Sequence, residues 1–295
     1  MPKLLPPTEQ QNPRTTRLDT QTPLRLARTF NTEDAHAALA VKKAAPAIAA
    51  SITAAARAFA GGHKIIFIGA GTSGRLGILE AVECVPTFGT KPSQIIGIIA
   101  GGNKAIFRAQ EGAEDNSLQG AKDLAKKAKK DDFVIGISAS GTAPYVQGAL
   151  AQAQKIGAYT ALLSCNPQAP IKHANIHIYL PTGPEALSGS TRLKAGTATK
   201  MALNAITTGA MTLCGKTYGN LMVDVRPTNK KLVARATRLI CQIAKTDESS
   251  AARLLKASGG NVKIAIVMHC KHVSAPTAKK LLSAKKGFLG KVLDD

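Results

Sequence analysis

Five short runs of uninterrupted apolar residues limit the folds open to this chain more than any other feature. They lie at residues 65–68, 95–99, 133–137, 159–163 and 176–180. Most are separated by stretches of helical character, and strands without polar alternation are buried on both faces, as in a parallel sheet covered by helices. The sequence therefore predicts an α/β fold with a doubly wound, parallel, five-stranded sheet.

Helical patterns flank this region on both sides. Thr32 followed by Glu33 and Asp34 predicts a helix start, because a hydroxyl cap and acidic residues suit a helix amino terminus. This helix is expected to run to Gly61–Gly62 with an interruption near Pro46, after an irregular segment over residues 1–31. Further helices are predicted at residues 190–215, 228–245, 248–257, 261–270 and 274–284. The predicted organisation is an N-terminal helical segment (1–62), a sheet domain (63–225) and a small C-terminal helical bundle (226–295).

Composition excludes several classes of protein. The chain has 295 residues, a hydrophobic share of 44% and a net charge of +21, so it can bury a core and is not a disordered polycation. It has no apolar run of transmembrane length, and neither a transmembrane helix nor a secretory signal is expected. Its five scattered cysteines indicate a reducing compartment, so a cytoplasmic location is expected. His269, Cys270 and His272 lack a nearby fourth ligand, and no metal site is predicted.

The high charge raises the question of a nucleic-acid partner. Residues 226–295 carry 15 basic and 4 acidic side chains, whereas residues 63–225 carry 16 and 10. About half of the excess thus lies in the predicted C-terminal bundle, in scattered residues rather than in a block. Aromatic residues make up only 4% of the chain, so platforms for base stacking are scarce. We interpret the charge as a basic solvated surface, and a nucleic-acid or membrane partner is not expected.

Two loops rich in glycine and hydroxyl groups follow predicted strands. They are Gly69–Gly77, which fits a GxGxxG pattern, and Ser138–Tyr145. In open parallel sheets ligands bind at the carboxyl ends of strands. Glycines there admit a close ligand, and helix amino termini bind anionic oxygens. The hydroxyl-rich second loop favours a compact phosphate, such as that of a phosphosugar, over a dinucleotide. Neither loop has the lysine of a nucleotide-binding P-loop.

Longer motifs carry a family resemblance. They are GAGTSGRLGILEAVECVPTFG (69–89), IIAGG (98–102), EGAED (111–115), SCNP (164–167), GSTRLKAGTATKM (189–201) and YGNLMVDVRPTN (218–229), together with TEQQNP (8–13) near the amino terminus. In this order the chain resembles the N-acetylmuramic acid 6-phosphate etherases, which have the SIS phosphosugar-binding fold.

The resemblance implies a lyase that cleaves the D-lactyl ether by elimination and water addition, without a cofactor, in cell-wall amino sugar recycling. It implies that Glu83 is the acid that assists lactate departure and Glu114 the base that takes the C2 proton. Two carboxyl groups in different protonation states suit such a reaction. Glu80, Glu111 and Asp115 are neighbouring acids without an implied role.

The substrate, a phosphorylated amino sugar, is expected to contact residues of both loops and two further side chains. The substrate-binding candidates are Thr72, Ser73, Ser138, Ser140, Gly141, Lys194 and Asn220. The chain departs from the family at Val82, Val85, Thr142 and Ala143, which bears on affinity and specificity. The resemblance also implies a homodimer.

Two other hypotheses about the function are also compatible with the sequence. An aldose–ketose isomerase would share the phosphate loops but would not need the segment from Glu83 to Phe88. A non-catalytic protein that senses sugar phosphates, as in the glucokinase regulatory branch of the same superfamily, would also share them.

Overall fold

The computed structural model describes residues 5–225, 227 and 229–294. These residues form two compact units. The first, called here the sheet unit, comprises the chain up to Val82 together with Ser93–Thr207. The second, called the helical unit, comprises Glu83–Pro92 together with the chain from Thr208 onward.

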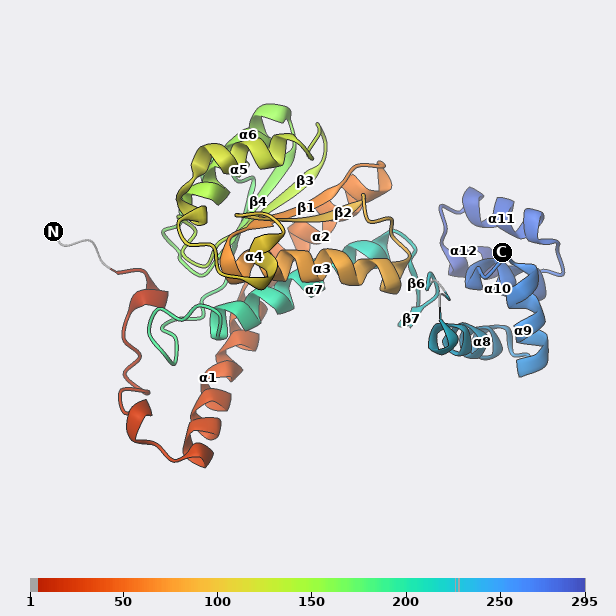
Figure 1. Ribbon diagram of the computed structural model, residues 1–295. Helices are drawn as coiled ribbons and strands as arrows, with labels where there is room; N and C mark the ends of the chain where they lie inside the picture. Colours follow the sequence, from red (N-terminus) through yellow and green to blue (C-terminus); the bar gives the residue numbers. More distant parts are fainter. Residues whose placement is uncertain (1–4, 226, 228, 295) are drawn as a thin grey trace. The chain divides into compact units, whose positions relative to one another are not determined.

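The sheet unit contains a five-stranded parallel sheet (Figure 1). Its strands are β1 (Ile65–Gly69), β2 (Ile95–Ile99), β3 (Phe133–Ile137), β4 (Tyr159–Ser164) and β5 (Ile176–Tyr179). Their order is β2-β1-β3-β4-β5, and all four pairings are parallel. The predicted fold and all five strands are confirmed. Every residue of β1 and β3 is buried, as expected for central strands covered on both faces.

Helices cover both faces of this sheet. On one face Ile66, Val134 and Leu162 pack in a single apolar cluster with residues of α6 (Pro144–Ile156). On the other face α3 (Gly71–Phe88) comes so close that a Cβ added to its Gly77 would lie 2.8 Å from the Cβ of Phe67. Helix α2 (Ala45–Ala60) also packs on the sheet. The three-layer arrangement places both predicted loops at the carboxyl edge of the strands.

The amino-terminal helices differ from the prediction. Helix α1 (Pro23–Lys43) begins ten residues earlier than expected, since its N-cap is Thr22 rather than Thr32, and it has proline in its first turn. The predicted start at Thr32 is wrong, because Glu33 is 2% exposed and serves an internal contact rather than a helix end. The break near Pro46 is confirmed, since α1 ends before Ala44 and α2 follows with Pro46 in its first turn. Short 3₁₀ turns, η1 (Pro7–Glu9) and η2 (Leu18–Thr20), precede α1.

Shorter elements complete the sheet unit. They are α4 (Lys104–Phe107), the 3₁₀ turn η3 (Ala113–Asp115) and α5 (Ser117–Ala125). Helix α7 (Lys194–Leu213) continues from the sheet unit into the helical unit and starts four residues later than predicted.

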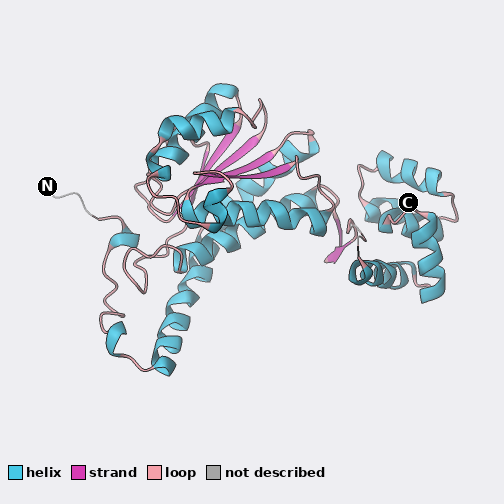
Figure 2. Cartoon of the chain, viewed as in Figure 1, coloured by secondary structure: helices cyan, strands magenta, loops and turns pink. Residues whose placement is uncertain are grey.

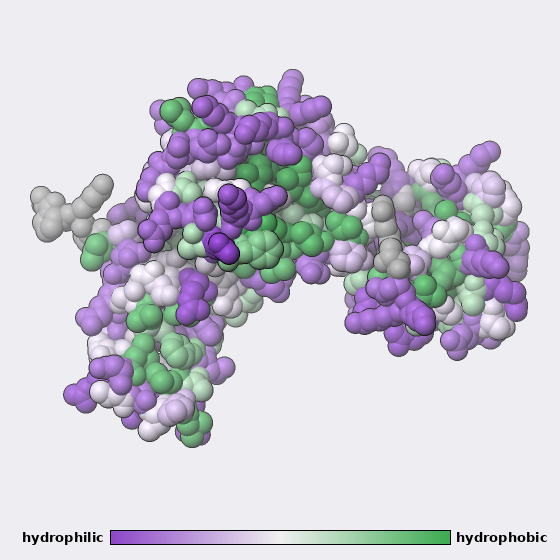
Figure 3. Space-filling model, viewed as in Figure 1, coloured by the Kyte–Doolittle hydropathy of each residue, from purple (hydrophilic) through white to green (hydrophobic). Residues whose placement is uncertain are grey.

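The helical unit has its own apolar core. Its helices are α8 (Lys230–Ala244), α9 (Glu248–Ala257), α10 (Val262–Cys270), α11 (Ala275–Ala284) and α12 (Leu289–Leu293). The first four agree closely with the predicted ones, whereas α12 and the hairpin β6 (Thr217–Tyr218)–β7 (Leu221–Met222) were not predicted (Figure 2). Buried Lys263 is satisfied by Asp224 at 2.9 Å and by two backbone carbonyls. In the view of Figure 3 the surface of these helices is largely hydrophilic with apolar patches between.

Within the described residues, no single helix has the length and apolar character needed to cross a membrane. Helices α1 and α2 meet those criteria only when taken together, with a bend of 62° between them.

Two glycines allow the close crossing of α5 and α6. A Cβ on Gly120 of α5 would lie 1.9 Å from the carbonyl oxygen of Tyr145 in α6. A Cβ on Gly148 of α6 would lie 2.1 Å from the carbonyl oxygen of Ser117 in α5. Helices α5 and α6 are also joined by a hydrogen bond, which the Tyr145 hydroxyl donates to Asp123 over 3.0 Å. Since backbone atoms cannot yield as side chains do, a side chain at either position would force the two helices apart.

We expect Gly120→Ala to lower the free energy of unfolding by roughly 1–3 kcal/mol, because the added methyl group overpacks a backbone contact. Urea denaturation followed by circular dichroism measures the loss. Gly290→Ala is the control: it lies in helix α12, and its added Cβ would have an ordinary contact at 3.6 Å. A Gly120→Ala protein as stable as wild type would contradict the packing described here.

Candidate functional site

The two predicted loops lie side by side because β1 and β3 are neighbouring parallel strands. Gly69, the last residue of β1, is in register with Ile137, the last residue of β3. The loops that follow these two residues therefore leave the sheet at the same edge. This is the place at which ligands bind in open parallel sheets.

The first loop is a single residue, Ala70, before α3 begins at Gly71. Gly71 has a φ of 52°, a conformation that favours glycine. Gly74 is needed for packing instead, since a Cβ there would lie 2.7 Å from the carbonyl oxygen of Gly69. Thr72 and Ser73 thus stand in the first turn of α3. Within the described residues their hydroxyls have no hydrogen-bond partner, so both are available to a ligand.

The second loop is held in shape by its own hydroxyls. The buried Ser138 Oγ accepts a hydrogen bond from the Gly141 amide at 3.1 Å, and Ser140 Oγ accepts one from the Thr142 hydroxyl at 2.9 Å. Gly141 has a φ of 72°, and a Cβ there would lie 2.3 Å from the Cβ of Ala169. The Ser138 hydroxyl is thus engaged in a hydrogen bond within the loop, while Ser140 is only half-buried and lies nearer the surface. Thr142, a departure from the family pattern, supports Ser140.

Glu114 lines a pocket of about 200 Å³ at this edge of the sheet. The pocket also includes Gly71 and Arg75 of α3, Ala100 after β2, and the segment 109–113. Glu114 itself is exposed, in the turn η3. The pocket thus brings Glu114 next to the amino terminus of α3, which carries Thr72 and Ser73.

Arg75 was missed by the sequence analysis. Its Nε donates to the carbonyl oxygen of Ile106 at 2.9 Å, and the residue lines the pocket of Glu114. The signal was present in the sequence, because Arg75 is the one cationic residue of the run 69–89. A lone arginine in a helix is a weak signal on its own, because such residues are usually solvated at the surface.

The remaining predicted residues fall elsewhere. Glu83 is exposed on α3, and Asn220 is exposed in the turn between β6 and β7; both belong to the helical unit. Their roles stay predictions. The nearby Glu80 differs from both: it is 6% exposed and accepts hydrogen bonds from Asn204 and Thr207 of α7, so it ties α3 to α7.

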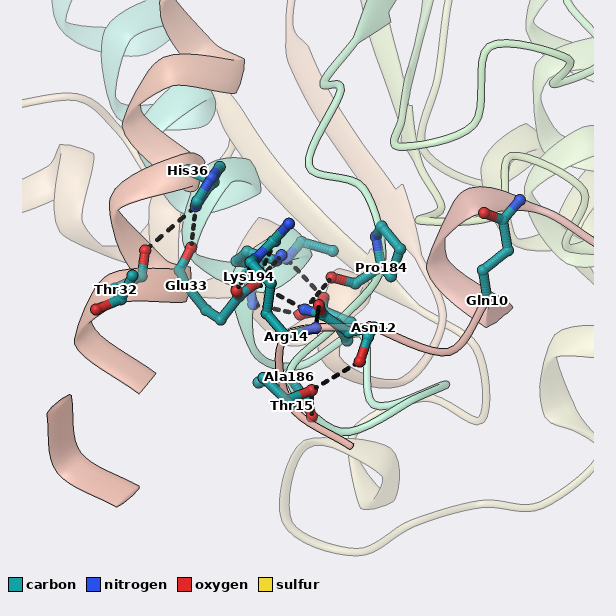
Figure 4. A network of polar contacts seen from close by, with 12 residues as sticks. Gln10, Asn12, Arg14, Thr15, Thr32, Glu33, His36, Pro184, Ala186 and Lys194 are labelled. Carbon is teal, nitrogen blue, oxygen red and sulfur yellow. Dashed lines mark hydrogen bonds and ion pairs between the residues drawn. The ribbon is translucent and has the colours of Figure 1, made fainter. Parts of the chain in front are cut away.

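Lys194, predicted to bind substrate, has a partner within the chain. Its side chain is 1% exposed, and its ammonium donates to Glu33 at 2.6 Å (Figure 4). Glu33 also accepts hydrogen bonds from Arg14, at 2.6 and 2.9 Å, and from Asn12 at 2.8 Å. Four side chains from three separate segments thus form one polar network. Lys194 does not line the pocket of Glu114.

The network fixes the charge state of Glu33. The hydrogen bonds from Arg14 first, and then those from Lys194 and Asn12, hold the pKa of Glu33 at about 2, against the cost of burial. The pKa of Glu185 is shifted in the opposite direction. This side chain is 0% exposed, and its burial raises the pKa. The amides of Lys194 and Ala195 donate hydrogen bonds to it, which opposes that shift.

Among the described residues, no three His, Cys, Asp or Glu side chains are grouped as metal ligands. Cys165 lies at the end of β4 with 0% exposure, and burial raises its pKa to about 12. A thiol with so high a pKa is not a nucleophile at neutral pH.

Comparison with known proteins decides the family. The chain is 49% identical over 289 residues to "N-acetylmuramic acid 6-phosphate etherase" of Gloeobacter violaceus, covering 97% of this chain and 94% of that protein. It is 47% identical to "N-acetylmuramic acid 6-phosphate etherase 2" of Vibrio cholerae, again covering 97% and 94%. The chain belongs to the N-acetylmuramic acid 6-phosphate etherase family.

Two further comparisons agree with this membership. An etherase of Thermosynechococcus vestitus is 51% identical over 264 residues, which cover 89% of this chain and 86% of that protein. The family profile of the glucokinase regulatory protein N-terminal SIS domain matches residues 47–154. That range includes β1, β2, β3 and both loops of the candidate site in this etherase family member. The resemblance stated from motifs is thereby confirmed.

The low pKa of Glu33 predicts acid sensitivity of the sheet unit. A carboxylate with a lowered pKa stabilises the fold above its unfolded pKa of about 4.5, and this contribution is lost as the pH falls toward 2. Glu33→Gln should therefore lower the free energy of unfolding by roughly 3–5 kcal/mol at pH 7, since Lys194 is left buried without its counter-charge. The difference between variant and wild type should shrink as the pH falls toward 2, measured by urea denaturation.

Asp19→Asn serves as the control, because Asp19 is an exposed carboxylate in the same amino-terminal segment. It should change stability by less than about 0.5 kcal/mol. A Glu33→Gln effect that stays constant from pH 7 to pH 2.5 would show that the ion pair is not the source of the stabilisation.

Proposed function

We propose that this chain is a carbon–oxygen lyase that cleaves the D-lactyl ether of N-acetylmuramic acid 6-phosphate, giving N-acetylglucosamine 6-phosphate and D-lactate. Family membership along nearly the whole chain carries the proposal, together with the retention of Glu83 and Glu114 in their motifs. The position of Glu114 in a pocket beside the amino terminus of α3 supports it. Such a reaction serves the recycling of cell-wall amino sugars.

The reaction divides into an elimination and an addition. In the ring-opened sugar the aldehyde acidifies the C2 proton, which we assign Glu114 to remove. The electron pair of the C2–H bond forms the C2–C3 double bond, and the C3–O bond breaks with its electrons moving to the lactyl oxygen. A proton from Glu83 neutralises that oxygen as lactate departs. Water then adds to C3, and C2 is protonated again.

The loops would bind the phosphate. Thr72 and Ser73 offer hydroxyls at the amino terminus of α3, where backbone amides and the helix dipole favour an anion. Ser140 adds a hydroxyl from the second loop, whose shape Gly141 maintains through the hydrogen bond of its amide to Ser138. Arg75, in the pocket with Glu114, would attract a substrate that carries a phosphate and a carboxylate. No cofactor has a part in this scheme.

We further propose that the protein acts as a cytoplasmic homodimer. Leu24, Phe30 and Leu39 of α1 are 61%, 36% and 54% exposed, and Figure 3 shows apolar surface over this part of the chain. Apolar side chains gathered on one helix suit contact with a second copy. The scattered basic residues of the helical unit are assigned to solvent, without a nucleic-acid or membrane partner.

A second candidate is a protein that senses sugar phosphates without turnover. The match of residues 47–154 to the glucokinase regulatory protein SIS domain favours it. An aldose–ketose isomerase remains a third reading. Incubation of the purified protein with N-acetylmuramic acid 6-phosphate, followed by enzymatic measurement of D-lactate, separates them. Binding without lactate release would favour the sensor and overturn the etherase.

Isotope labelling tests the lyase chemistry itself. In H₂¹⁸O the label should enter the C3 hydroxyl of N-acetylglucosamine 6-phosphate and be absent from D-lactate, because the sugar C3–O bond is the one that breaks. In D₂O the product should carry deuterium at C2. Mass spectrometry reads both. Label in the hydroxyl of lactate would show cleavage on the lactyl side and exclude an elimination across C2 and C3.

Glu114→Gln and Glu83→Gln should each lower kcat by on the order of 10²–10⁴-fold, the contribution typical of a general acid or base. Both side chains are exposed, so the folds should stay intact. Asp115→Asn is the matched control, since Asp115 is adjacent, exposed and outside the pocket of Glu114. It should retain nearly full turnover. If either glutamine variant did so too, that residue's role would be wrong.

A further inference from the structure

An amino-terminal strap, defined here as residues 8–15, binds the segment that leads into α7, called here the approach segment (residues 184–189). The Thr15 hydroxyl donates to the carbonyl oxygen of Ala186 at 2.8 Å, and the Gly189 amide donates to that of Thr8 at 3.3 Å. The Asn12 amide reaches the carbonyl oxygen of Pro184 at 3.4 Å. Strap and approach segment are more than 160 residues apart in sequence, so these contacts exist only in the folded sheet unit.

Glu33 joins the strap to α7. Its carboxylate accepts hydrogen bonds from Arg14 and Asn12 of the strap and from Lys194, the first residue of α7. In Figure 4 the labelled side chains of Asn12, Arg14 and Lys194 converge on Glu33. Since Glu33 is 2% and Lys194 1% exposed, neither charge can find a replacement partner in water.

The start of α7 is closed to a ligand by the same arrangement. The amides of Lys194 and Ala195 donate to the buried carboxylate of Glu185 at 3.0 and 2.9 Å. The ammonium of Lys194 is bound by Glu33. Neither the helix amino terminus nor the lysine side chain is therefore free to bind a phosphate.

The first turn of α7 lies close to the first turn of α3, which carries Thr72. A Cβ on the buried Gly196 would be 3.8 Å from the side-chain methyl group of Thr72. Thr72 carries one of the free hydroxyls at the amino terminus of α3. A displacement of the start of α7 would thus move a residue that lies beside a proposed phosphate-binding group.

We propose that Glu33 is a positioning residue for substrate binding, which holds the first turn of α7 against Thr72 through Lys194 and ties both to the amino-terminal strap. This inference rests on the proposed function for the identity of the substrate. It gives Lys194 a different role from the predicted one: the lysine orients the wall of the site and does not contact the phosphate.

A double-mutant cycle tests the inference, with the variants Glu33→Gln, Lys194→Met and the two combined. Hydrogen exchange of the Gly189, Lys194 and Ala195 amides reports the position of α7 independently of activity. Glu33→Gln should lose protection there and raise KM by on the order of tenfold, about the worth of one charge-assisted hydrogen bond. Its kcat should stay within about threefold, since Glu33 touches no reacting atom.

The combined variant should recover part of both protection and KM, because no uncompensated buried charge remains. If instead Lys194→Met loses substrate binding and the combination recovers none of it, the lysine is a direct ligand and the inference is overturned. Should Glu33→Gln fail to fold, Arg14→Met is the milder substitute. Arg14 has a side chain 51% exposed, and its loss leaves the Glu33–Lys194 pair in place with a smaller effect in the same direction.

Asp132→Asn is the matched control for lost stability. Asp132 is also 2% exposed, and it accepts hydrogen bonds from the amides of Lys64 and Lys129 at 2.8 and 2.7 Å. It directly precedes β3, at the opposite edge of the sheet from the loops. It should destabilise the protein without changing KM, and an equal KM change in both variants would reduce Glu33 to a structural residue. Absence of lactate with wild type would overturn the proposed function alone, since the exchange experiment needs no turnover.

Discussion

Burial of the sheet on both faces is the constraint on which the rest of the structure depends. A strand with apolar side chains on both sides must be covered twice, so helices have to lie above and below it, and each connection has to cross from one edge of the sheet to the other. All strand ends of one polarity then meet at one edge. The loops after β1 and β3 become neighbours although about 70 residues separate them in sequence, and the free hydroxyls of Thr72 and Ser73 gather there.

Close backbone contact is the second requirement, and glycine meets it. Gly74 and Gly77 let α3 approach the sheet, and Gly120 and Gly148 let α5 cross α6. The glycines of the first loop thus have different roles. Gly71 has the positive φ at the start of α3, whereas the others of the GxGxxG-like run serve packing. A glycine pattern indicates that another group comes close to the backbone, and only the structure shows whether that group is a helix, a strand or a ligand.

Buried charge is the third feature, and it links segments that are far apart in sequence. A carboxylate such as Glu33 can be buried only if donors replace the lost water, and Asn12, Arg14 and Lys194 supply them from segments far apart in sequence. This network explains why the predicted helix start at Thr32 is wrong. Acidic residues after a threonine resemble a helix cap, but the Glu33 side chain is buried and binds a lysine 161 residues away.

The sequence by itself determined the five strands, their parallel arrangement, the two loops and the family, because these depend on local hydropathy and on long motifs. It could not assign Lys194 and Arg75, whose surroundings are made by residues distant in the chain. Lys194, predicted to bind the substrate, is paired with Glu33 in the structure, and Arg75, which was not predicted, lines the pocket of Glu114. Only the tertiary structure decided these, because the partner of a charged side chain is set by which segments the fold brings together.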